Sequence, residues 1–341
     1  MSSVINKAAY DTLKSMQSAN WQEQIRTSIK SPETLLKHLD ICSREIDLSV
    51  NSLRHFPVKV PLGFVDRMQK GNPADPLLRQ VLPLAAEDED LPHFSSDPVG
   101  ELARRTGTGI LHKYHGRALL ITTGACAIHC RYCFRRHFPY EEEHTTGNWG
   151  KPLEYLGKDT SIKEIILSGG DPLALSDTKL LNLINRLAAI PAIKRLRIHS
   201  RIPVVIPARV TDDLVQVLSQ SRLTPIAVIH CNHPGELDER VGDALIKLRN
   251  AGIVVLNQSV MLKGVNDDWN TIAALCERLI EYGVLPYYLH MLDPVAGAAH
   301  FNVPDEAAGT IMEDLRIHLP GFLVPRLVRE QAGAPYKIPI L

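Results

Sequence analysis

The chain has 341 residues and carries 38 acidic and 38 basic side chains, so its formal net charge at pH 7 is zero. Hydrophobic residues make up 45% of it, which suffices for a large core. A balanced chain without a basic stripe is not expected to bind nucleic acid. No run of 18 apolar residues occurs, and the N-terminus lacks a signal-peptide core. We therefore expect a cytoplasmic protein that does not use a membrane.

Residues 1–100 contain helical patterns interrupted by proline, as in PVKVPLGFVDRM, GNPADPLL and LPHFSSDP. Because proline ends helices and favours turns, we expect a helical and irregular N-terminal region. The acidic run Glu87–Asp90 lies within it. Charged residues are mostly exposed in proteins, so we predict a solvated loop at this run.

A regular alternation of strands and helices begins near residue 117. Six short aliphatic runs favour strands: 118–123, 164–168, 195–199, 226–230, 253–257 and 285–290. Amphipathic stretches between them favour helices, such as 176–189, 211–220, 238–250 and 268–282. The spacing of about thirty residues suits βαβ units, and a complete barrel needs eight of them. The pattern predicts an α/β fold, a partial (β/α)6 TIM-like barrel over 101–320, followed by a C-terminal segment over 321–341.

Three of the six cysteines lie within eight residues, as Cys126, Cys130 and Cys133, directly after the first strand of the barrel. The carboxyl ends of barrel strands are where such folds place their chemistry. Thiolates select zinc or an iron–sulfur cluster. A cubane held by three cysteines would keep one iron open for another ligand. Zinc would need a fourth ligand, for which His129 or His137 could serve, and a third interpretation has the thiols merely buried.

The C-x3-C-x2-C spacing, with Tyr132 immediately before the last cysteine, resembles the signature of the radical S-adenosylmethionine superfamily. The resemblance implies a [4Fe–4S] cluster on the three cysteines, with S-adenosylmethionine on the open iron. It also implies the partial barrel of that superfamily, here with a helical N-terminal extension.

Two further segments support this resemblance. Ser168-Gly169-Gly170-Asp171 follows the strand at 164–168 and resembles the segment that contacts the methionine amino group of S-adenosylmethionine. Glycine lets the backbone approach a ligand closely. Gln258 follows the strand at 253–257, and its strand-end position makes it a candidate contact of S-adenosylmethionine.

From about residue 60 to the C-terminus, the chain resembles lysine 2,3-aminomutases. The resemblance is carried by LHKYHGRALLITTGACAIHCRYCFRRHF, LSGGDPL, RIHSRIPVVIPARVT, HCNHPGE, NQSVMLKGVND and PYYLHMLDPVAGAAHF. It is especially similar to the short branch associated with β-lysine modification of elongation factor P. By that resemblance Lys337, in GAPYKIP, binds pyridoxal phosphate covalently, and Lys113 and Arg117 hold the phosphate of that cofactor. Lys113 stands where an arginine is more familiar, which keeps the charge but loses bidentate geometry.

The same resemblance assigns the residues that hold the substrate. Arg135 matches the arginine that pairs with the substrate carboxylate, a bidentate task suited to guanidinium. Asp293 and Glu330 match the acidic pair that binds the ε-ammonium of lysine. Longer aminomutases have aspartate at the second position, so Glu330 carries its carboxylate one methylene further out.

The resemblance implies an isomerase that converts free L-lysine to β-lysine, with the R enantiomer expected. A 5′-deoxyadenosyl radical would start a migration of the amino group that pyridoxal phosphate assists. Expected partners are an electron donor such as flavodoxin or ferredoxin, and a ligase that acts on elongation factor P. Three alternatives stay open: a 2,3-aminomutase of another amino acid such as glutamate, a metal-binding scaffold without turnover, and lysine within a protein as substrate.

Four histidines lie at or just after strand ends: His199, His230, His233 and His290. A structural role is as consistent with their positions as a functional one.

Overall fold

A computed structural model describes residues 20–106, 109–143 and 148–340. Its centre is one nine-stranded sheet in which the spatial order of the strands follows the sequence. Seven strands are parallel: β2 (Arg117–Thr123), β3 (Glu164–Gly169), β4 (Arg195–Ser200), β5 (Thr224–His230), β6 (Val254–Val260), β7 (Leu285–His290) and β8 (Arg326–Arg329). Antiparallel strands β1 (Ile110–Tyr114) and β9 (Ile338–Pro339) form the two edges.

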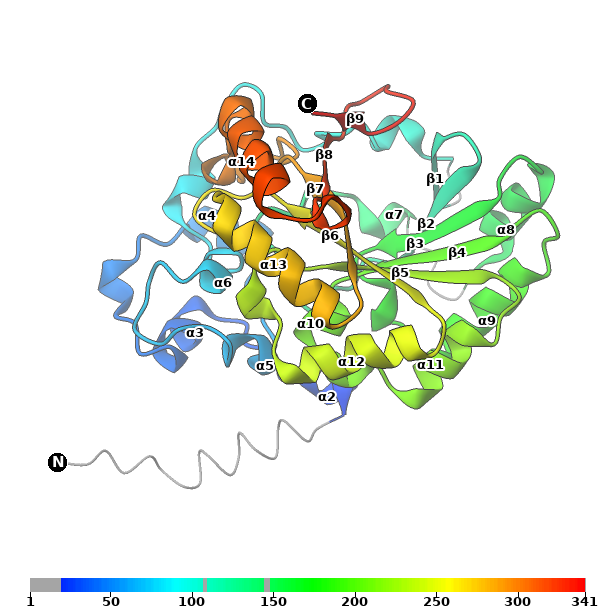
Figure 1. Cartoon of the computed structure of the whole chain (residues 1–341), viewed down its shortest axis with the longest axis horizontal. Coiled ribbons are helices and arrows are strands. Elements are labelled where there is room, and N and C mark those ends of the chain that lie inside the picture. Colours follow the sequence, from blue (N-terminus) through cyan, green and yellow to red (C-terminus); the bar gives the residue numbers. More distant parts are fainter. Residues whose placement is uncertain (1–19, 107–108, 144–147, 341) are drawn as a thin grey trace.

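The sheet curves without closing, so the fold is the expected partial barrel (Figure 1). All six predicted strands are present, each followed by a helix or helical segment, and β8 adds a seventh parallel strand. The Gly/Pro-rich composition of the tail hid β8 and β9, which are short and lie close to the chain end. Through β9 the tail returns to the sheet, which brings Lys337 to its edge.

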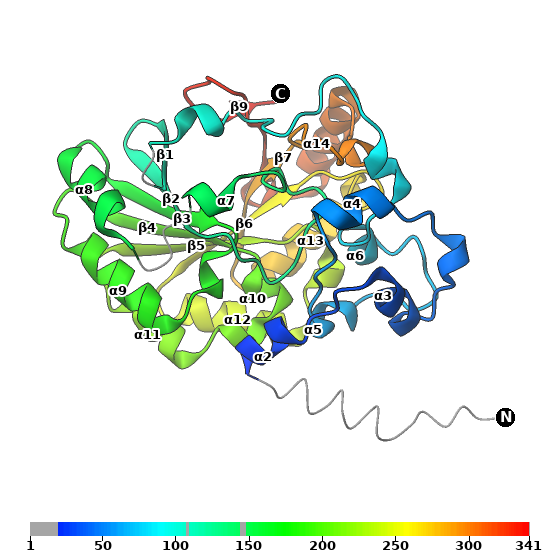
Figure 2. The same cartoon turned by 180° about the vertical axis from the view of Figure 1, so that it is seen from behind.

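Helices cover the outer face of the sheet (Figures 1 and 2). The helices that follow β2 along the chain are α7 (Tyr140–Glu143), α8 (Gly150–Lys158), α9 (Asp177–Ala188), α10 (Ile202–Val205), α11 (Asp212–Ser219), α12 (Glu239–Asn250), α13 (Trp269–Glu281) and α14 (Asp305–His318). Each of the four predicted helices begins at an N-cap residue whose side chain accepts a hydrogen bond from a backbone N–H of the first turn. These N-cap residues are Ser176, Thr211, Asp238 and Asp268. In α9 the apolar stripe of Leu180, Leu183, Ile184 and Leu187 is buried, as its spacing predicts.

The N-terminal region consists of short helices, as predicted. They are α2 (Trp21–Arg26), α3 (Pro32–His38), α4 (Val50–His55), α5 (Leu62–Val65) and α6 (Pro76–Arg79). Further 3-10 turns are η1 (Ser43–Glu45), η2 (Ala85–Asp88), η3 (Leu102–Arg104), η4 (Pro172–Ala174), η5 (Pro207–Arg209), η6 (Pro234–Glu236), η7 (Ala299–Phe301) and η8 (Gly321–Leu323). One hydrophobic cluster contains Leu35, Phe64 and Leu77 of this region together with Leu183 and Leu196 of the barrel. The domain boundaries near 100 and 320 stay a prediction.

The acidic run Glu87–Asp90 is a solvated loop only in part. Asp88, Glu89 and Asp90 are exposed, but the Glu87 side chain is fully buried. Its carboxylate accepts hydrogen bonds from Arg131 at 2.7 and 2.6 Å and from Arg136 at 2.8 Å. The prediction was wrong for Glu87 because burial becomes favourable when two guanidinium groups compensate the charge.

Among the described residues, no helix has the length and apolar character that crossing a bilayer requires.

Candidate active site

All fourteen residues that the sequence predicts as site residues line one cavity of about 320 Å³. The cavity lies at the carboxyl ends of the parallel strands, where His199, His230 and His290 also line it. Parallel strands bring residues distant in sequence to one edge of a sheet, so the strand-end positions predicted this grouping.

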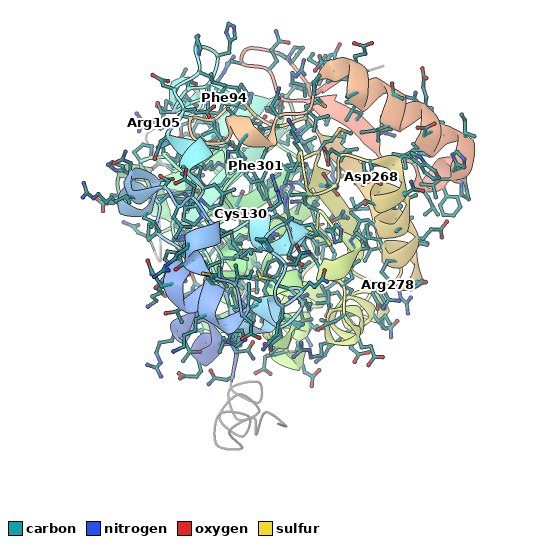
Figure 3. All side chains as sticks on the ribbon, turned by 90° about the vertical axis from the view of Figure 1, so that its left-hand side faces the viewer. Phe94, Arg105, Cys130, Asp268, Arg278 and Phe301 are labelled. Carbon is teal, nitrogen blue, oxygen red and sulfur yellow. The ribbon has the colours of Figure 1, made fainter. Side chains whose placement is uncertain are left out.

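The cysteine loop follows β2 and is held from outside by the N-terminal region. Lys59 Nζ donates to the carbonyl of Cys126 at 2.6 Å, and the backbone N–H of His129 donates to Lys59 at 3.0 Å. The N–H of Arg131 donates to the carbonyl of Gln80 at 2.9 Å. Figure 3 labels Cys130 in a view from the side on which the N-terminal region lies. The loop is therefore fixed by segments that lie outside the barrel.

The two histidines considered as zinc ligands are engaged elsewhere. The ring of His129 stacks on Phe56 at 4.8 Å, and its Nδ1 contacts the Pro57 carbonyl at 2.7 Å. His137 Nε2 contacts the Ala296 carbonyl at 3.2 Å. Within the described ranges, no three His, Cys, Asp or Glu side chains are arranged to hold a single metal ion.

The three thiols suit a cluster that compensates their charge. Burial and the neighbouring cysteines raise the pKa of Cys126 and of Cys133, that of Cys133 to about 11. Thiolates bind metals as anions, so a positively charged iron centre would supply the missing compensation. Three cysteines that line one cavity fit a [4Fe–4S] cluster with one iron open toward that cavity.

A buried polar network that was not predicted from the sequence contacts Cys130. Arg201 donates to Cys130 Sγ at 2.7 Å and to the Tyr132 hydroxyl at 2.6 Å. Glu236, fully buried, accepts from Arg201 at 3.0 Å, and Gln80 accepts at 2.7 Å. The aromatic residue of the cysteine motif is thus anchored through Arg201, whose charge Glu236 balances.

The glycine segment packs directly against the cysteine loop. A Cβ atom on Gly170 would lie 2.4 Å from the Ala125 carbonyl oxygen, and one on Gly169 would lie 2.6 Å from that of Thr123. Gly169 also has a φ of 120°, which side chains rarely adopt. Both positions therefore require glycine for a close approach of two backbones.

Asp171 uses its carboxylate within the protein. Oδ1 accepts from Ser200 Oγ at 2.7 Å and from the N–H of Leu173 at 3.0 Å. Oδ2 accepts from the N–H groups of Arg201 at 2.8 Å and Ile202 at 3.1 Å. Four donors fill the four lone-pair positions of a carboxylate. Any contact of this segment with S-adenosylmethionine therefore falls to the backbone and Ser168.

Glu330 is the centre of the charged cluster around Lys337. Its carboxylate accepts from Lys113 at 2.6 Å, from the Lys337 ammonium and from the Tyr114 hydroxyl. Burial alone would raise its pKa, but Lys337, Lys113 and Tyr114 outweigh burial and lower it to about 2. Glu330 is thus an anion that holds Lys337 in place, and the extra methylene over aspartate lengthens its reach.

Asp293 lies in the same cavity, and its Oδ1 atom is buried without a hydrogen-bond partner. Burial raises the pKa of Asp293 to about 7, against the opposing effect of Lys337. A buried polar atom without a partner is costly, and a cation would satisfy it. Asp293 is therefore free for a ligand, whereas Glu330 is already engaged.

Lys113 and Arg117 differ in what they offer a phosphate. Lys113 is committed to Glu330 and to the Val99 carbonyl at 3.0 Å. Arg117 lies over the ring of Tyr114 at 4.6 Å, and no carboxylate in the described part of the chain pairs with it. The guanidinium of Arg117 therefore fits a phosphate group of pyridoxal phosphate. Lys113 would have to share its ammonium between Glu330 and such a phosphate.

Arg135 is buried and has a protein partner that the sequence did not reveal. Its Nε and Nη2 donate to both carboxylate oxygens of Glu101, at 2.7 and 2.6 Å. Nη1 donates to Ser168 Oγ at 2.8 Å. A signal for Glu101 was absent because it belongs to the irregular segment before β1.

The four histidines divide into two kinds. His233 Nδ1 accepts from the N–H of Gly235 at 3.0 Å and caps η6, and His230 pairs with the Tyr132 hydroxyl at 2.9 Å. His199 and His290 each have a buried Nε2 without a partner. Burial lowers the pKa of His230 and of His290 to about 3, so both rings are neutral near pH 7. A ligand could still use His199 and His290.

Comparison with known proteins places this cavity in context. A model of the Radical SAM superfamily matches residues 120–276. The chain is 48% identical to the L-lysine 2,3-aminomutase of Escherichia coli (strain K12), with 96% of each chain covered. It is 44% identical to the enzyme of the same name from Haemophilus influenzae, over 93% of this chain and 94% of that protein. The chain belongs to the L-lysine 2,3-aminomutase family.

Membership in this family indicates which cofactors the chain uses. Radical SAM proteins use a [4Fe–4S] cluster and S-adenosylmethionine, lysine 2,3-aminomutases also depend on pyridoxal phosphate, and these enzymes are isomerases. The family includes longer proteins: the L-lysine 2,3-aminomutase of Clostridium subterminale is 31% identical over 97% of this chain but only 81% of its own length. The sequence-based expectations of family, fold class and cofactors are confirmed.

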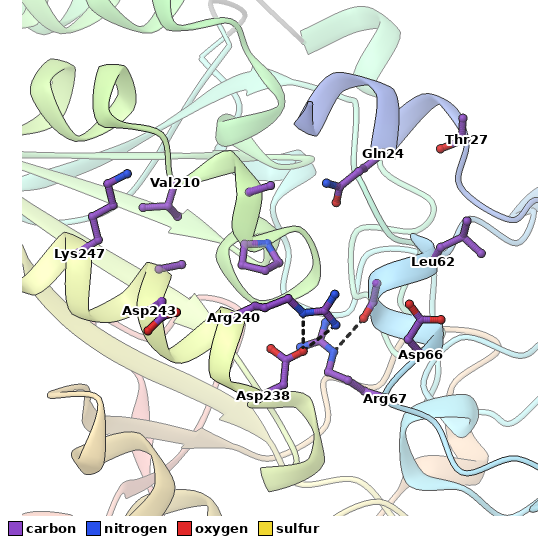
Figure 4. Close-up of a pocket in the computed structure, with 14 residues that line it drawn as sticks. Gln24, Thr27, Leu62, Asp66, Arg67, Val210, Asp238, Arg240, Asp243 and Lys247 are labelled. Carbon is purple, nitrogen blue, oxygen red and sulfur yellow. Dashed lines mark hydrogen bonds and ion pairs between the residues drawn. The ribbon is translucent and has the colours of Figure 1, made fainter. Parts of the chain in front are cut away.

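A second cavity, of about 350 Å³, lies between the N-terminal helices and α12, and none of the predicted site residues lines it (Figure 4). Its charged groups largely serve the fold. Arg240 pairs with Asp238 at 2.8 Å, and Arg67 donates to the carbonyls of Gly63 at 3.1 Å and Val204 at 2.8 Å.

Proposed function

We propose that this chain converts free L-lysine to β-lysine, as the name of its relatives indicates for them. The observation that carries the proposal is the charge arrangement of the cavity. Carboxylates lie beside Lys337, and a buried arginine beside Ser168 lines the same cavity. Free lysine has a cation at one end and a carboxylate at the other, which matches this arrangement.

When bound, the cluster with S-adenosylmethionine supplies a carbon radical, and pyridoxal phosphate supplies a conjugated imine that assists migration of the amino group. We propose that Cys126, Cys130 and Cys133 hold the cluster, and that Lys337 binds pyridoxal phosphate covalently. Arg117 takes the phosphate, with Lys113 as a second cation. Ser168, Gly169, Gly170 and Gln258 then contact S-adenosylmethionine, and Asp171 supports this segment through its hydrogen bonds.

Glu330 and Asp293 would bind the ε-ammonium of lysine in turn. Lys337 now donates to Glu330. Once Lys337 is bonded covalently to the cofactor, its nitrogen no longer offers three N–H donors, and Glu330 can accept from the substrate. Asp293 has a free buried oxygen for the same ammonium. Two carboxylates around one cation satisfy the requirement that a buried charge be compensated.

The residues at both ends would orient the substrate. With Arg135 on the carboxylate and the acids on the ammonium, both ends of lysine would be held and its carbon chain would be fixed in the cavity, which is catalysis by positioning. The apolar wall of Ile128, Val228 and Val260 keeps water away from a reactive carbon centre.

The proposal extends to biological context. It includes a flavodoxin or ferredoxin as electron donor and the R enantiomer of the product. It also includes a link through free β-lysine to a ligase acting on elongation factor P, which rests on resemblance to the short branch. A cytoplasmic location belongs to it as well, because the three thiols must stay reduced to bind iron.

Substrate choice tests the proposal against the glutamate alternative. Reconstituted protein is incubated anaerobically with S-adenosylmethionine, pyridoxal phosphate, dithionite and either L-lysine, L-glutamate or a peptide with an internal lysine. We expect a β-amino acid from L-lysine alone, because Asp293 and Glu330 repel a side-chain carboxylate and Arg135 requires a free one. Turnover of glutamate, or of the peptide in preference to lysine, would refute the substrate assignment. Absence of S-adenosylmethionine cleavage would favour the scaffold alternative.

A further inference from the structure

The segment that precedes β1 forms a wall of the active-site cavity, although it lies outside the matched superfamily region. Ser95 pairs with Val295 in a parallel bridge, directly beyond Asp293. The N–H of Ser95 donates to the Pro294 carbonyl at 2.9 Å, and the N–H of Ala296 donates back to Ser95 at 2.9 Å. Figure 3 shows Phe94 and Arg105, close to the two ends of the segment, above Cys130.

The same segment also contacts the Lys337 end of the cavity. A Cβ atom on Gly100 would lie 3.0 Å from that of Ala332, and the Val99 carbonyl accepts from Lys113. Residues 94–104 thus touch three parts of the cavity: the Asp293 loop, the tail that carries Lys337, and the Glu330 cluster through Lys113. Such a wall can place a side chain with precision, because its backbone is fixed at several points.

Glu101 is the charged side chain that this wall directs at the substrate site. Its backbone N–H donates to Asp97 Oδ1 at 2.8 Å, which fixes the turn. Its carboxylate accepts hydrogen bonds from Nε and Nη2 of Arg135 in a side-on pair, and the hydroxyl of Ser168 accepts a hydrogen bond from Nη1. Glu101 is 9% and Arg135 7% exposed, so the pair is screened little by water.

We propose that Glu101 is a positioning residue that sets the guanidinium of Arg135 for the substrate carboxylate. A guanidinium has five N–H groups in a rigid fork. Glu101 accepts from Nε and from one N–H of Nη2, while Nη1 donates to Ser168 Oγ at 2.8 Å and makes a long contact of 3.5 Å with the Gly169 carbonyl. The second N–H of Nη2, with an Nη1 N–H that gives up this long contact, can form the end-on pair that a carboxylate needs. Glu101 therefore does not compete with the substrate, because it holds the side-on edge and leaves the end-on edge free.

This inference rests on the proposed binding of the substrate carboxylate by Arg135. It adds a residue from the segment before β1 to the residues that set substrate specificity. Without the Glu101 charge, Arg135 can rotate about its side-chain bonds, and its end-on edge is no longer aimed at the substrate. The carboxylate end of lysine would bind more weakly, whereas the ammonium end would not change.

The test compares Glu101→Gln, Glu101→Asp and a control, Asp305→Asn, which removes the charge from an exposed ion pair with Arg329. We expect Glu101→Gln to raise KM for L-lysine by about 10- to 100-fold, the size of one charge-assisted hydrogen bond. Glu101→Asp should recover part of this loss, and the control should match the wild type. An unchanged or lowered KM in Glu101→Gln would overturn the proposal.

L-Lysinamide, which lacks the carboxylate, separates a positioning role of Glu101 from general damage to the cavity. As an inhibitor of lysine turnover, it should bind Glu101→Gln and wild type with inhibition constants within about twofold. A loss of lysinamide binding equal to the loss for lysine would show general damage to the cavity and overturn the assignment. The proposed function is judged separately, since it fails only if the wild type does not turn over lysine.

Discussion

Two cations and a phenol converge on Glu330, whereas Asp293 has a buried oxygen without a partner. The two acids therefore differ in pKa, and only Asp293 changes its protonation near neutral pH. The pKa of Glu330 is lowered to about 2, so it stays charged throughout the neutral range. Burial raises the pKa of Asp293 to about 7, so its protonation changes near neutral pH when the cavity holds no ligand.

The raised pKa of Asp293 predicts a specific pH dependence of stability in the cofactor-free protein. Between its unfolded value, 3.8, and about 7, the folded chain holds a proton that the unfolded chain has lost. Stability from this group is fully present below 3.8 and is lost as pH rises through 7. Asp293→Asn removes this loss, so the variant should gain stability relative to wild type from pH 5 to pH 7, by about 1–3 kcal/mol.

Urea denaturation of both proteins at the two pH values checks this. The difference between the proteins isolates Asp293, since buried histidines such as His290 titrate in both. A difference that does not change with pH would contradict the raised pKa.

At the same scale, the sequence predicted residues that the structure brings into one cavity, but it did not predict their partners. Motif spacing and strand-end positions placed the cysteines, Gly169 and Gly170 on one cavity. Glu101, Arg201 and Glu236 were missed because a buried ion pair leaves no pattern in one sequence; each partner looks like an ordinary surface charge. The same reason explains the wrong prediction for Glu87.

At the scale of elements, the contact between β3 and the cysteine loop is a backbone-to-backbone contact. Gly170→Ala would place its Cβ 2.4 Å from the Ala125 carbonyl, next to Cys126, so the loop must move. We expect the variant to retain markedly less iron and sulfide after reconstitution than wild type, with about 1–3 kcal/mol lost from folding stability. The control is Gly157→Ala on α8, where an added Cβ meets no atom within 4 Å. Equal iron content in both variants would contradict this account.

Elements with a strong period were the ones that the sequence could predict. The helix of residues 177–188 and the strands of the barrel repeat their apolar positions over several turns or residues, and each appears where expected. The short strands β1, β8 and β9 were not predicted, because five or fewer residues give too short a pattern to be distinguished from a loop. These segments become strands because they hydrogen-bond to neighbouring strands at the edges of the sheet.

At the scale of the whole molecule, Glu87 joins the N-terminal region to the cysteine loop. Its carboxylate binds Arg131, between Cys130 and Tyr132, and Arg136. Glu87→Gln would leave two buried guanidinium groups without a counter-charge, which typically costs about 3–5 kcal/mol. The exposed neighbour Glu89→Gln serves as the control. Urea denaturation of the two variants should separate them by that amount, and equal midpoints would show that this ion cluster does not stabilise the fold.

The N-terminal region therefore has two roles in the whole chain. It shares one hydrophobic core with the barrel, and it supplies Lys59 and Glu87, which contact the cysteine loop, and Val99, which lines the cavity. The barrel provides the strand ends, and the tail provides Glu330 and Lys337. The cavity is assembled from all three parts of the sequence, which is why residues far apart along the chain must be tested together.

The most direct test of the central claim is an anaerobic assay of the reconstituted protein with L-lysine, S-adenosylmethionine, pyridoxal phosphate and dithionite, with products separated by chiral chromatography. We predict β-lysine from the wild type and none from Lys337→Ala or Cys130→Ala. If S-adenosylmethionine is cleaved while L-lysine is recovered unchanged, the cluster assignment stands and the proposed aminomutase activity is contradicted.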